Sequence, residues 1–169
     1  MVPTPIRGQI TMQHKHYTVQ EATKKMEHFC AYQERCHKEV VAKLKTMGMI
    51  PLAVDQIMGH LIQGNYLNEE RFAQSYARGK HRIKKWGRKR IERELRQRDI
   101  SAYNVRRALQ EIPEDTYLQT LEALALKKWE QLGKGNVQAR KRKLSQYLLY
   151  RGWEPHLVYD LAHRLGAKG

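Results

Sequence analysis

The sequence predicts an all-α protein made of three tandem three-helix repeats. The first reason is an apolar pattern that recurs three times, with copies about fifty residues apart, as in repeat proteins whose units stack. Its equivalent positions are Val40, Ile91 and Leu144, then Leu44, Leu95 and Leu148, then Val54, Val105 and Val158. The second reason is a composition rich in helix-favouring residues, with no stretch that alternates apolar and polar residues. We therefore expect three helices in each repeat.

The first repeat is expected to span residues 18–64, after a flexible N-terminal arm over residues 1–17. Thr18 followed by Glu21 forms the pattern of a capping box, which opens a helix by satisfying its free backbone N–H groups. The second helix should end at Gly48, because glycine readily adopts the left-handed conformation of a helix C-cap. The third helix opens with a proline, which lacks only an N–H that would be unpaired there.

The middle repeat is expected over residues 65–112. Asn68 is a favourable N-cap for its first helix, Gly87 separates the first helix from the second, and Ser101 caps the third. The same kinds of signal therefore delimit three helices in this copy as in the first.

The last repeat is expected over residues 113–169. Asn136 can cap its second helix, and Pro155 occupies the first turn of the third. Trp129 lies on the apolar stripe of the long first helix, and Trp153 aligns with apolar residues in the other two copies. We expect both tryptophans to lie in the core.

The charge and the cysteine content limit the possible partners and locations. The 169 residues carry a formal net charge of +15, from 32 Lys and Arg against 17 Asp and Glu. This excess favours a polyanionic partner, either nucleic acid, an acidic protein surface or an anionic membrane. No apolar run approaches the roughly 20 residues that span a bilayer. Cys30 and Cys36 are expected on different faces of one helix, which disfavours a disulfide and indicates a reduced, cytoplasmic location.

Most of the basic charge is concentrated in the middle repeat. Between Arg71 and Arg98 there are twelve Lys or Arg residues, opposed only by Glu92 and Glu94. Like charges at helical spacing repel, so such a cluster favours a binding surface for phosphates or carboxylates, although a solvated face is the simpler interpretation. A second basic cluster in the last repeat occupies an equivalent position and should extend the same face. The candidate binding residues are Arg78, Lys80, Arg82, Lys84, Lys85, Trp86, Arg88, Lys89, Arg90, Arg93, Arg140, Lys141 and Arg142.

Trp86 lies between two helices of the basic run and has two interpretations. An exposed indole there stacks on a base or fills a pocket of a protein partner. Alternatively, Trp86 closes the end of the local core. The sequence leaves both interpretations open.

No catalytic or metal-binding constellation is predicted. His28, Cys30, Cys36 and His37 lack the spacing of a zinc knuckle, and His14 and His16 in the arm are expected to be solvated. There is no glycine-rich phosphate loop, no nucleophile elbow and no strand to carry either. We therefore expect no metal, no catalytic residue and no enzymatic activity.

The middle and last repeats contain several distinctive motifs. They are Tyr66-Leu67-Asn68-Glu69-Glu70-Arg71-Phe72-Ala73, Tyr76-Ala77-Arg78, Gly87-Arg88-Lys89-Arg90-Ile91-Glu92-Arg93-Glu94-Leu95, Lys127-Lys128-Trp129 and Leu148-Leu149-Tyr150-Arg151-Gly152-Trp153. These motifs resemble those of the RecX family, regulators of the bacterial recombinase RecA. The similarity covers about residues 20–166 and is most specific in the middle repeat. One departure is Asp99, which stands where the family usually has glycine, so the helix end there should tolerate a left-handed residue at some cost.

The resemblance implies a fold and a partner. It implies an elongated, curved array of helical repeats that lies in the groove of the RecA filament on single-stranded DNA, blocks its activities and promotes its disassembly. It also implies no cofactor, and we expect a monomer that does not bind membranes. The alternative is a protein that binds DNA or RNA directly through its basic face, since both functions require the same charge. An amphipathic membrane-surface protein and an enzyme of unrecognised type are weaker alternatives.

Overall fold

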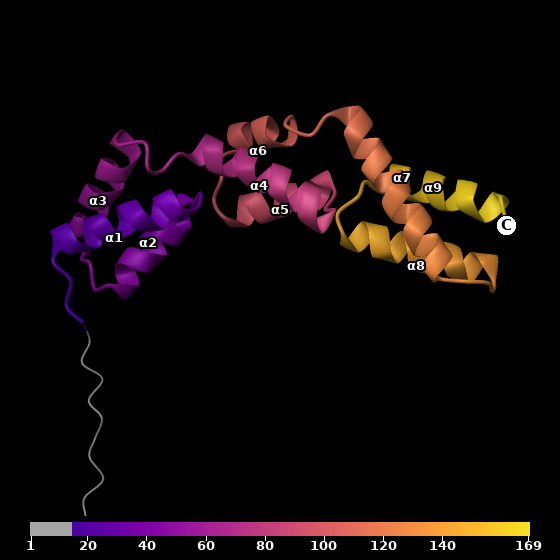
Figure 1. The fold of residues 1–169 in the computed structure, drawn as a ribbon, viewed down its shortest axis with the longest axis horizontal. Helices are drawn as coiled ribbons and strands as arrows, with labels where there is room; N and C mark the ends of the chain where they lie inside the picture. The colour runs from indigo at the N-terminus through magenta and orange to yellow at the C-terminus, as the bar shows by residue number, and fades with distance from the viewer. Residues whose placement is uncertain (1–14) are drawn as a thin grey trace, which may run out of the picture.

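The structure, a computed structural model, describes residues 15–169, which form nine α-helices and no strand (Figure 1). The helices are α1 (Val19–Tyr32), α2 (His37–Thr46), α3 (Pro51–Gln63), α4 (Glu69–Lys84), α5 (Arg88–Gln97), α6 (Ala102–Leu109), α7 (Glu114–Gln131), α8 (Val137–Tyr150) and α9 (Pro155–Ala167). The all-α prediction is confirmed. The predicted arm over residues 1–17 lies almost wholly outside the described residues. Within the described part, no helix is both long enough and apolar enough to cross a membrane.

The helices pack in consecutive groups of three. In the first triplet α3 packs against α1 and α2, in the middle triplet α6 packs against α4 and α5, and in the last triplet α7, α8 and α9 contact one another. Figure 1 shows the triplets following one another along the long axis in a shallow arc. The predicted elongated, curved array is therefore observed.

The helix boundaries follow the predicted capping signals. Thr18 and Glu21 form a reciprocal capping box at α1, with both backbone-to-side-chain hydrogen bonds at 3.1 Å. The side chains of Asn68, Ser101 and Asn136 each accept a hydrogen bond from a backbone N–H in the first turn of α4, α6 and α8. Side-chain caps from the neighbouring sequence therefore begin these four helices.

The recurring apolar positions lie in the core, as predicted. Leu44, Leu95 and Leu148 are all fully buried. The residue that ends the helix in each copy is left-handed, with φ of +80° at Gly48, +58° at Asp99 and +89° at Gly152. Asp99 thus adopts the conformation that glycine provides in the other copies, at the modest cost expected for aspartate.

One prediction about side-chain placement is wrong. Cys30 and Cys36 do not share a helix, because α1 ends at Tyr32 and Cys36 is the N-cap of α2. On α7 the buried face passes through Tyr117, which is fully buried. The phenol of Tyr117 is buried because it has polar partners there. Trp129 and Trp153 are buried, as predicted.

The buried side chains form two cores rather than three. One belongs to the first triplet alone. The other runs without interruption through the middle and last triplets, from Phe72 on α4 to Ala162 on α9, and it also receives Cys36 from the segment before α2. Helices α4–α9 therefore form a single packing unit.

Polar contacts join the first triplet to this unit. Arg71 on α4 pairs with Glu34 at 2.6 Å and also donates to the backbone carbonyl of Asn65. Lys38 on α2 donates to the carbonyl of Gln97 and lies 3.4 Å from the carboxylate of Asp99. The buried Cys36 lies between these contacts in the sequence and supplies the apolar part of the junction.

The middle and last triplets are joined by a backbone contact between two turns. The turn between α4 and α5 meets the turn between α8 and α9, where Gly87 N–H donates to the carbonyl of Arg151 at 2.9 Å and Lys89 N–H donates to that of Gly152 at 3.0 Å. A Cβ on Gly87 would overlap the carbonyl group of Gly152. A Cβ on Gly152 would overlap Arg90. Gly87 and Gly152 must therefore both lack a side chain for the turns to approach this closely.

We predict that Gly87→Ala destabilises the protein by about 1–3 kcal/mol, because the added methyl group forces two backbone segments apart. The matched control is Gly79→Ala within α4, where nothing among the described residues lies within 4 Å of the added Cβ. Alanine should stabilise that helix by about 0.5–1 kcal/mol. Urea unfolding followed by circular dichroism measures both changes. Equal stabilities for the two variants would contradict the close approach of the turns.

Candidate partner-binding surface

Five of the twelve basic residues between Arg71 and Arg98 are paired with acidic side chains of the protein itself. The pairs are Arg71 with Glu34, Arg78 with Glu111, Arg88 with Glu114 and Glu154, Arg96 with Glu92, and Arg98 with Glu94. Only the last two pairs lie within one helix. The sequence count of twelve cations against two acids therefore overstates the charge available to a partner.

Arg88 is the most deeply placed of these cations. Its guanidinium contacts the carboxylates of Glu114 and Glu154 and lies 3.8 Å from the centre of the Tyr117 ring. Its side chain is only 25% exposed. Arg88 therefore links α5 to α7 and to the start of α9, and in this position it serves the fold.

An aromatic cluster surrounds this arginine. The Tyr117 hydroxyl donates to the Glu154 carboxylate and accepts from the backbone N–H of Arg88 at 3.0 Å. The Tyr117 ring lies 4.5 Å from that of Trp153 and 5.4 Å from that of His81, measured between centroids. Burial, reinforced by the hydrogen bond to Glu154, raises the pKa of Tyr117 far above its usual range. The tyrosine is therefore a neutral hydrogen-bonding group of the junction.

Trp86 is half-buried and packs against the core shared by the middle and last triplets. Two cations lie over its ring, with Lys80 Nζ at 5.1 Å and Arg90 Cζ at 4.2 Å from the centroid. Arg90 also lies 5.0 Å from the centre of the Tyr150 ring. These contacts favour the interpretation in which Trp86 closes the core.

Five cations of the run remain exposed and form no ion pair with the residues that the structure describes. They are Arg82, Lys84, Lys85, Lys89 and Arg93, and we refer to them as the exposed basic set. They lie at the end of α4, in the following turn and on α5. Lys89 and Arg93 border the same hollow on α5.

The second basic cluster, on α8, is divided in a similar way. Arg140 turns inward, with its guanidinium 3.8 Å from the centre of the Trp129 ring and a hydrogen bond to the Trp129 carbonyl. Lys141 and Arg142 border a hollow between α8 and α9. This hollow is separate from the one that Lys89 and Arg93 border.

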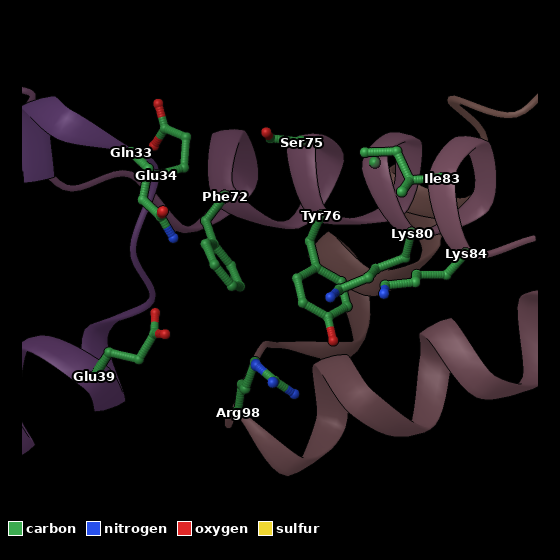
Figure 2. A pocket seen from close by; sticks show the side chains of 11 residues that line it. Gln33, Glu34, Glu39, Phe72, Ser75, Tyr76, Lys80, Ile83, Lys84 and Arg98 are labelled. Atoms are coloured by element: carbon green, nitrogen blue, oxygen red, sulfur yellow. The ribbon is translucent and has the colours of Figure 1, made fainter. Parts of the chain in front are cut away.

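A hollow of about 450 Å³ lies between the first and middle triplets (Figure 2). Glu34 and Glu39 stand at one end of it, and Lys80 and Lys84 of α4 stand at the other. One carboxylate oxygen of Glu34 is buried and has no hydrogen-bond partner among residues 15–169. This hollow therefore has opposite charges at its two ends.

A further hollow of about 330 Å³ lies where the end of α4 meets α7 and α8. Its basic residues are Lys84, Lys85, Lys127, Lys128 and Arg151. The last three could not be recognised as part of this site from the sequence, because they come from the last triplet and meet α4 only in the folded chain. Among residues 15–169, no group of three or more His, Cys, Asp and Glu side chains is arranged to hold a metal ion.

Comparisons with known proteins agree on one family. Family models for the second and third three-helix domains of RecX match residues 68–109 and 115–162. The regulatory protein RecX of Prosthecochloris aestuarii is 30% identical over 130 residues, which cover 77% of this chain and 83% of that protein. The RecX of Listeria welshimeri is 24% identical over 140 residues, which cover 83% of this chain and 52% of that protein. The chain thus spans about half the length of several curated relatives that it matches.

A solved structure shows the same arrangement of helices. The crystal structure of RecX from Lactobacillus salivarius superposes with a TM-score of 0.77 at 21% identity, over 88% of this chain and 97% of that one. Another crystal structure, of a regulatory protein RecX, gives a TM-score of 0.74 at 23% identity, over 86% of this chain and 73% of that one. At these identities the similarity establishes the fold.

The cluster at the junction predicts a dependence of stability on pH. Burial lowers the pKa of His81, whose Nδ1 donates to the Trp86 carbonyl and whose Nε2 is buried with no partner among the described residues. The unfolded chain therefore binds a proton more readily than the folded chain, and stability is lost as the pH falls through about 6.5. We expect a slope of at most about 1.4 kcal/mol per pH unit in urea unfolding between about pH 7.5 and 5.5.

His81→Gln should flatten this dependence, whereas His163→Gln, at an exposed position on α9, should leave it unchanged. A slope that persists in the His81 variant would assign the titration to another group.

Proposed function

The chain belongs to the RecX family, and from this premise we propose that it is a regulatory protein that binds the RecA filament on single-stranded DNA and inhibits or modulates the recombinase. The observation that carries the proposal is the exposed basic set on the middle triplet, in an elongated array. Side chains without internal partners can release counterions from phosphates or pair with carboxylates of a protein. A RecA filament on DNA offers both kinds of anion.

The proposed mechanism is a shift in the equilibrium of the filament. A ligand shifts such an equilibrium only as far as its affinities for the two states differ. An elongated protein that contacts several successive subunits has a different affinity for the assembled filament than for free subunits, because a free subunit offers only some of these contacts. We propose that it acts as a monomer in the cytoplasm, without a cofactor and without catalysing a reaction.

The second candidate function is direct binding of nucleic acid through the exposed basic set. The same cations support it, since phosphate contacts need no further chemistry. The two functions predict different preferences between bare and RecA-coated single-stranded DNA. They also predict different changes of binding affinity with salt concentration. Tighter binding to bare single-stranded DNA than to RecA-coated DNA, with a steep loss of affinity as salt rises, would favour the second function.

We predict that the double variant Lys89→Glu, Arg93→Glu raises the concentration needed to inhibit the DNA-dependent ATPase of RecA by roughly tenfold or more, since it places like charge against an anionic partner. The two side chains are exposed on α5 and have no ion-pair partners among the described residues. Arg88 and Arg90 are left unchanged because they contribute to the fold. The assay is steady-state ATP hydrolysis on single-stranded DNA at physiological salt.

The matched control is Lys24→Glu, Lys45→Glu, which makes the same change in charge at exposed positions of the first triplet. This control should inhibit RecA as the original protein does. If both double variants lose inhibition equally, net charge rather than the α5 surface determines binding. If neither loses it, the exposed basic set is not the binding surface.

A further inference from the structure

The hollow between the end of α4, α7 and α8 is lined by basic residues and by no acidic residue. We refer to it as the junction groove. Its five cations, Lys84, Lys85, Lys127, Lys128 and Arg151, are accompanied by no acidic residue. None of the five forms an ion pair with a described carboxylate. The charge of this groove is therefore available to an anionic ligand.

Two of the five cations, Arg151 and Lys128, are held in place before any ligand binds. Arg151 donates to the backbone carbonyl of Lys84 at 2.7 Å, and its guanidinium lies 4.7 Å from the centre of the Tyr147 ring. Lys128 Nζ lies 4.8 Å from the same ring. Because these side chains are already ordered, binding an anion there loses less conformational entropy than binding to free surface lysines.

The junction groove also has an apolar component. Ile83 is 68% exposed, although it is a large aliphatic residue, and Leu124 and Tyr147 border the groove as half-buried neighbours. A surface that binds only phosphates has no need of an exposed isoleucine beside its cations. An apolar side chain of a partner would cover Ile83 and gain from the area removed from water.

The chemistry of the groove favours a protein ligand over a nucleic acid. Tyr147 is its aromatic residue, and two cations already lie over the Tyr147 ring, so a base stacking there would compete with them. Ile83 and Lys84 also border the hollow between the first and middle triplets, where Glu34 and Glu39 stand (Figure 2). Glu34 is paired with Arg71, but Glu39 forms no ion pair with a described residue, and a phosphate backbone that continued along α4 would approach its carboxylate.

We propose that the junction groove binds an acidic protein segment that carries an aliphatic side chain, with its carboxylates on the five cations and its aliphatic group on Ile83. The proposal rests on the proposed function, because it identifies the kind of RecA-filament surface that this part of the protein contacts. In this proposal the junction groove contacts protein, and Lys89 and Arg93 on α5 contact the remaining anionic groups of the partner.

The test uses the full chain and two short fluorescein-labelled peptides in a fluorescence anisotropy titration. One peptide consists of glutamates around a single leucine, and the other has serine in place of the leucine. The protein should bind the leucine peptide about tenfold more tightly, in the range expected when a few methylene groups are buried. Labelled oligothymidylate is the nucleic-acid probe.

Two variants separate the parts of the groove. Ile83→Ser should remove the preference for the leucine peptide and leave binding of the serine peptide unchanged. Lys84→Glu, Lys127→Glu should weaken both peptides about tenfold or more, because each new carboxylate repels the peptide. The matched controls are Ile62→Ser, at an aliphatic position on α3 that is 47% exposed, and Lys24→Glu, Lys45→Glu. Both controls should bind the peptides as the original protein does.

Three outcomes would overturn the proposal. They are equal binding of the two peptides, an unchanged leucine preference in Ile83→Ser, and displacement of the leucine peptide by oligothymidylate in a manner that depends on Lys84 and Lys127. RecA ATPase assays on the same variants separate this proposal from the proposed function. If the groove variants fail to bind peptide but still inhibit RecA fully, the junction groove is not the filament contact and the proposed function stands. If the original protein binds peptide but does not inhibit RecA, the proposed function fails.

Discussion

The close approach of two turns determines how the rest of the molecule is arranged. The backbone of the turn after α4 lies directly against the turn after α8, with hydrogen bonds from Gly87 and Lys89 to the facing carbonyls. Neither turn can carry a side chain at its point of contact, since a Cβ on Gly152 would overlap Arg90. The indole N–H of Trp153 adds a hydrogen bond to the carbonyl of Lys85. Six helices consequently share one core instead of forming two separate three-helix bundles.

The same contact explains why part of the basic run is structural. Arg88 follows Gly87 immediately, so docking of the two turns brings its side chain against the last triplet. Removing a guanidinium from water is costly unless carboxylates and hydrogen-bond acceptors surround it, and Glu114 and Glu154 provide them. Arg90 also packs at the junction, over the Trp86 ring, whereas Lys89 and Arg93 on α5 remain exposed. One stretch of sequence therefore supplies both the internal ion pairs and the external charge.

The sequence alone was sufficient for features that depend on neighbours a few residues away. Capping by Asn68 or Ser101 needs only the first turn of the same helix, and the recurring apolar positions follow from helical periodicity. The roles of individual cations could not be predicted in this way. Arg88 finds its partners on α7 and α9, and the junction groove combines α4 with lysines of α7. Such pairings are set by how the triplets dock, which no local pattern encodes.

The division into two packing units bears on the proposed regulation of a filament. Within α4–α9 the shared core fixes the junction groove relative to α5, so the anionic sites of a partner must match a fixed spacing to engage both surfaces. The first triplet has its own core and joins this unit through Arg71, Lys38 and the buried Cys36. The exposed Lys38–Asp99 pair contributes little energy, so the partly buried Arg71–Glu34 pair and the burial of Cys36 matter more to that junction. Under the proposed function, a basic unit with this fixed geometry would favour the filament state whose anionic sites have the matching spacing, and a difference in affinity between filament states is what regulation requires.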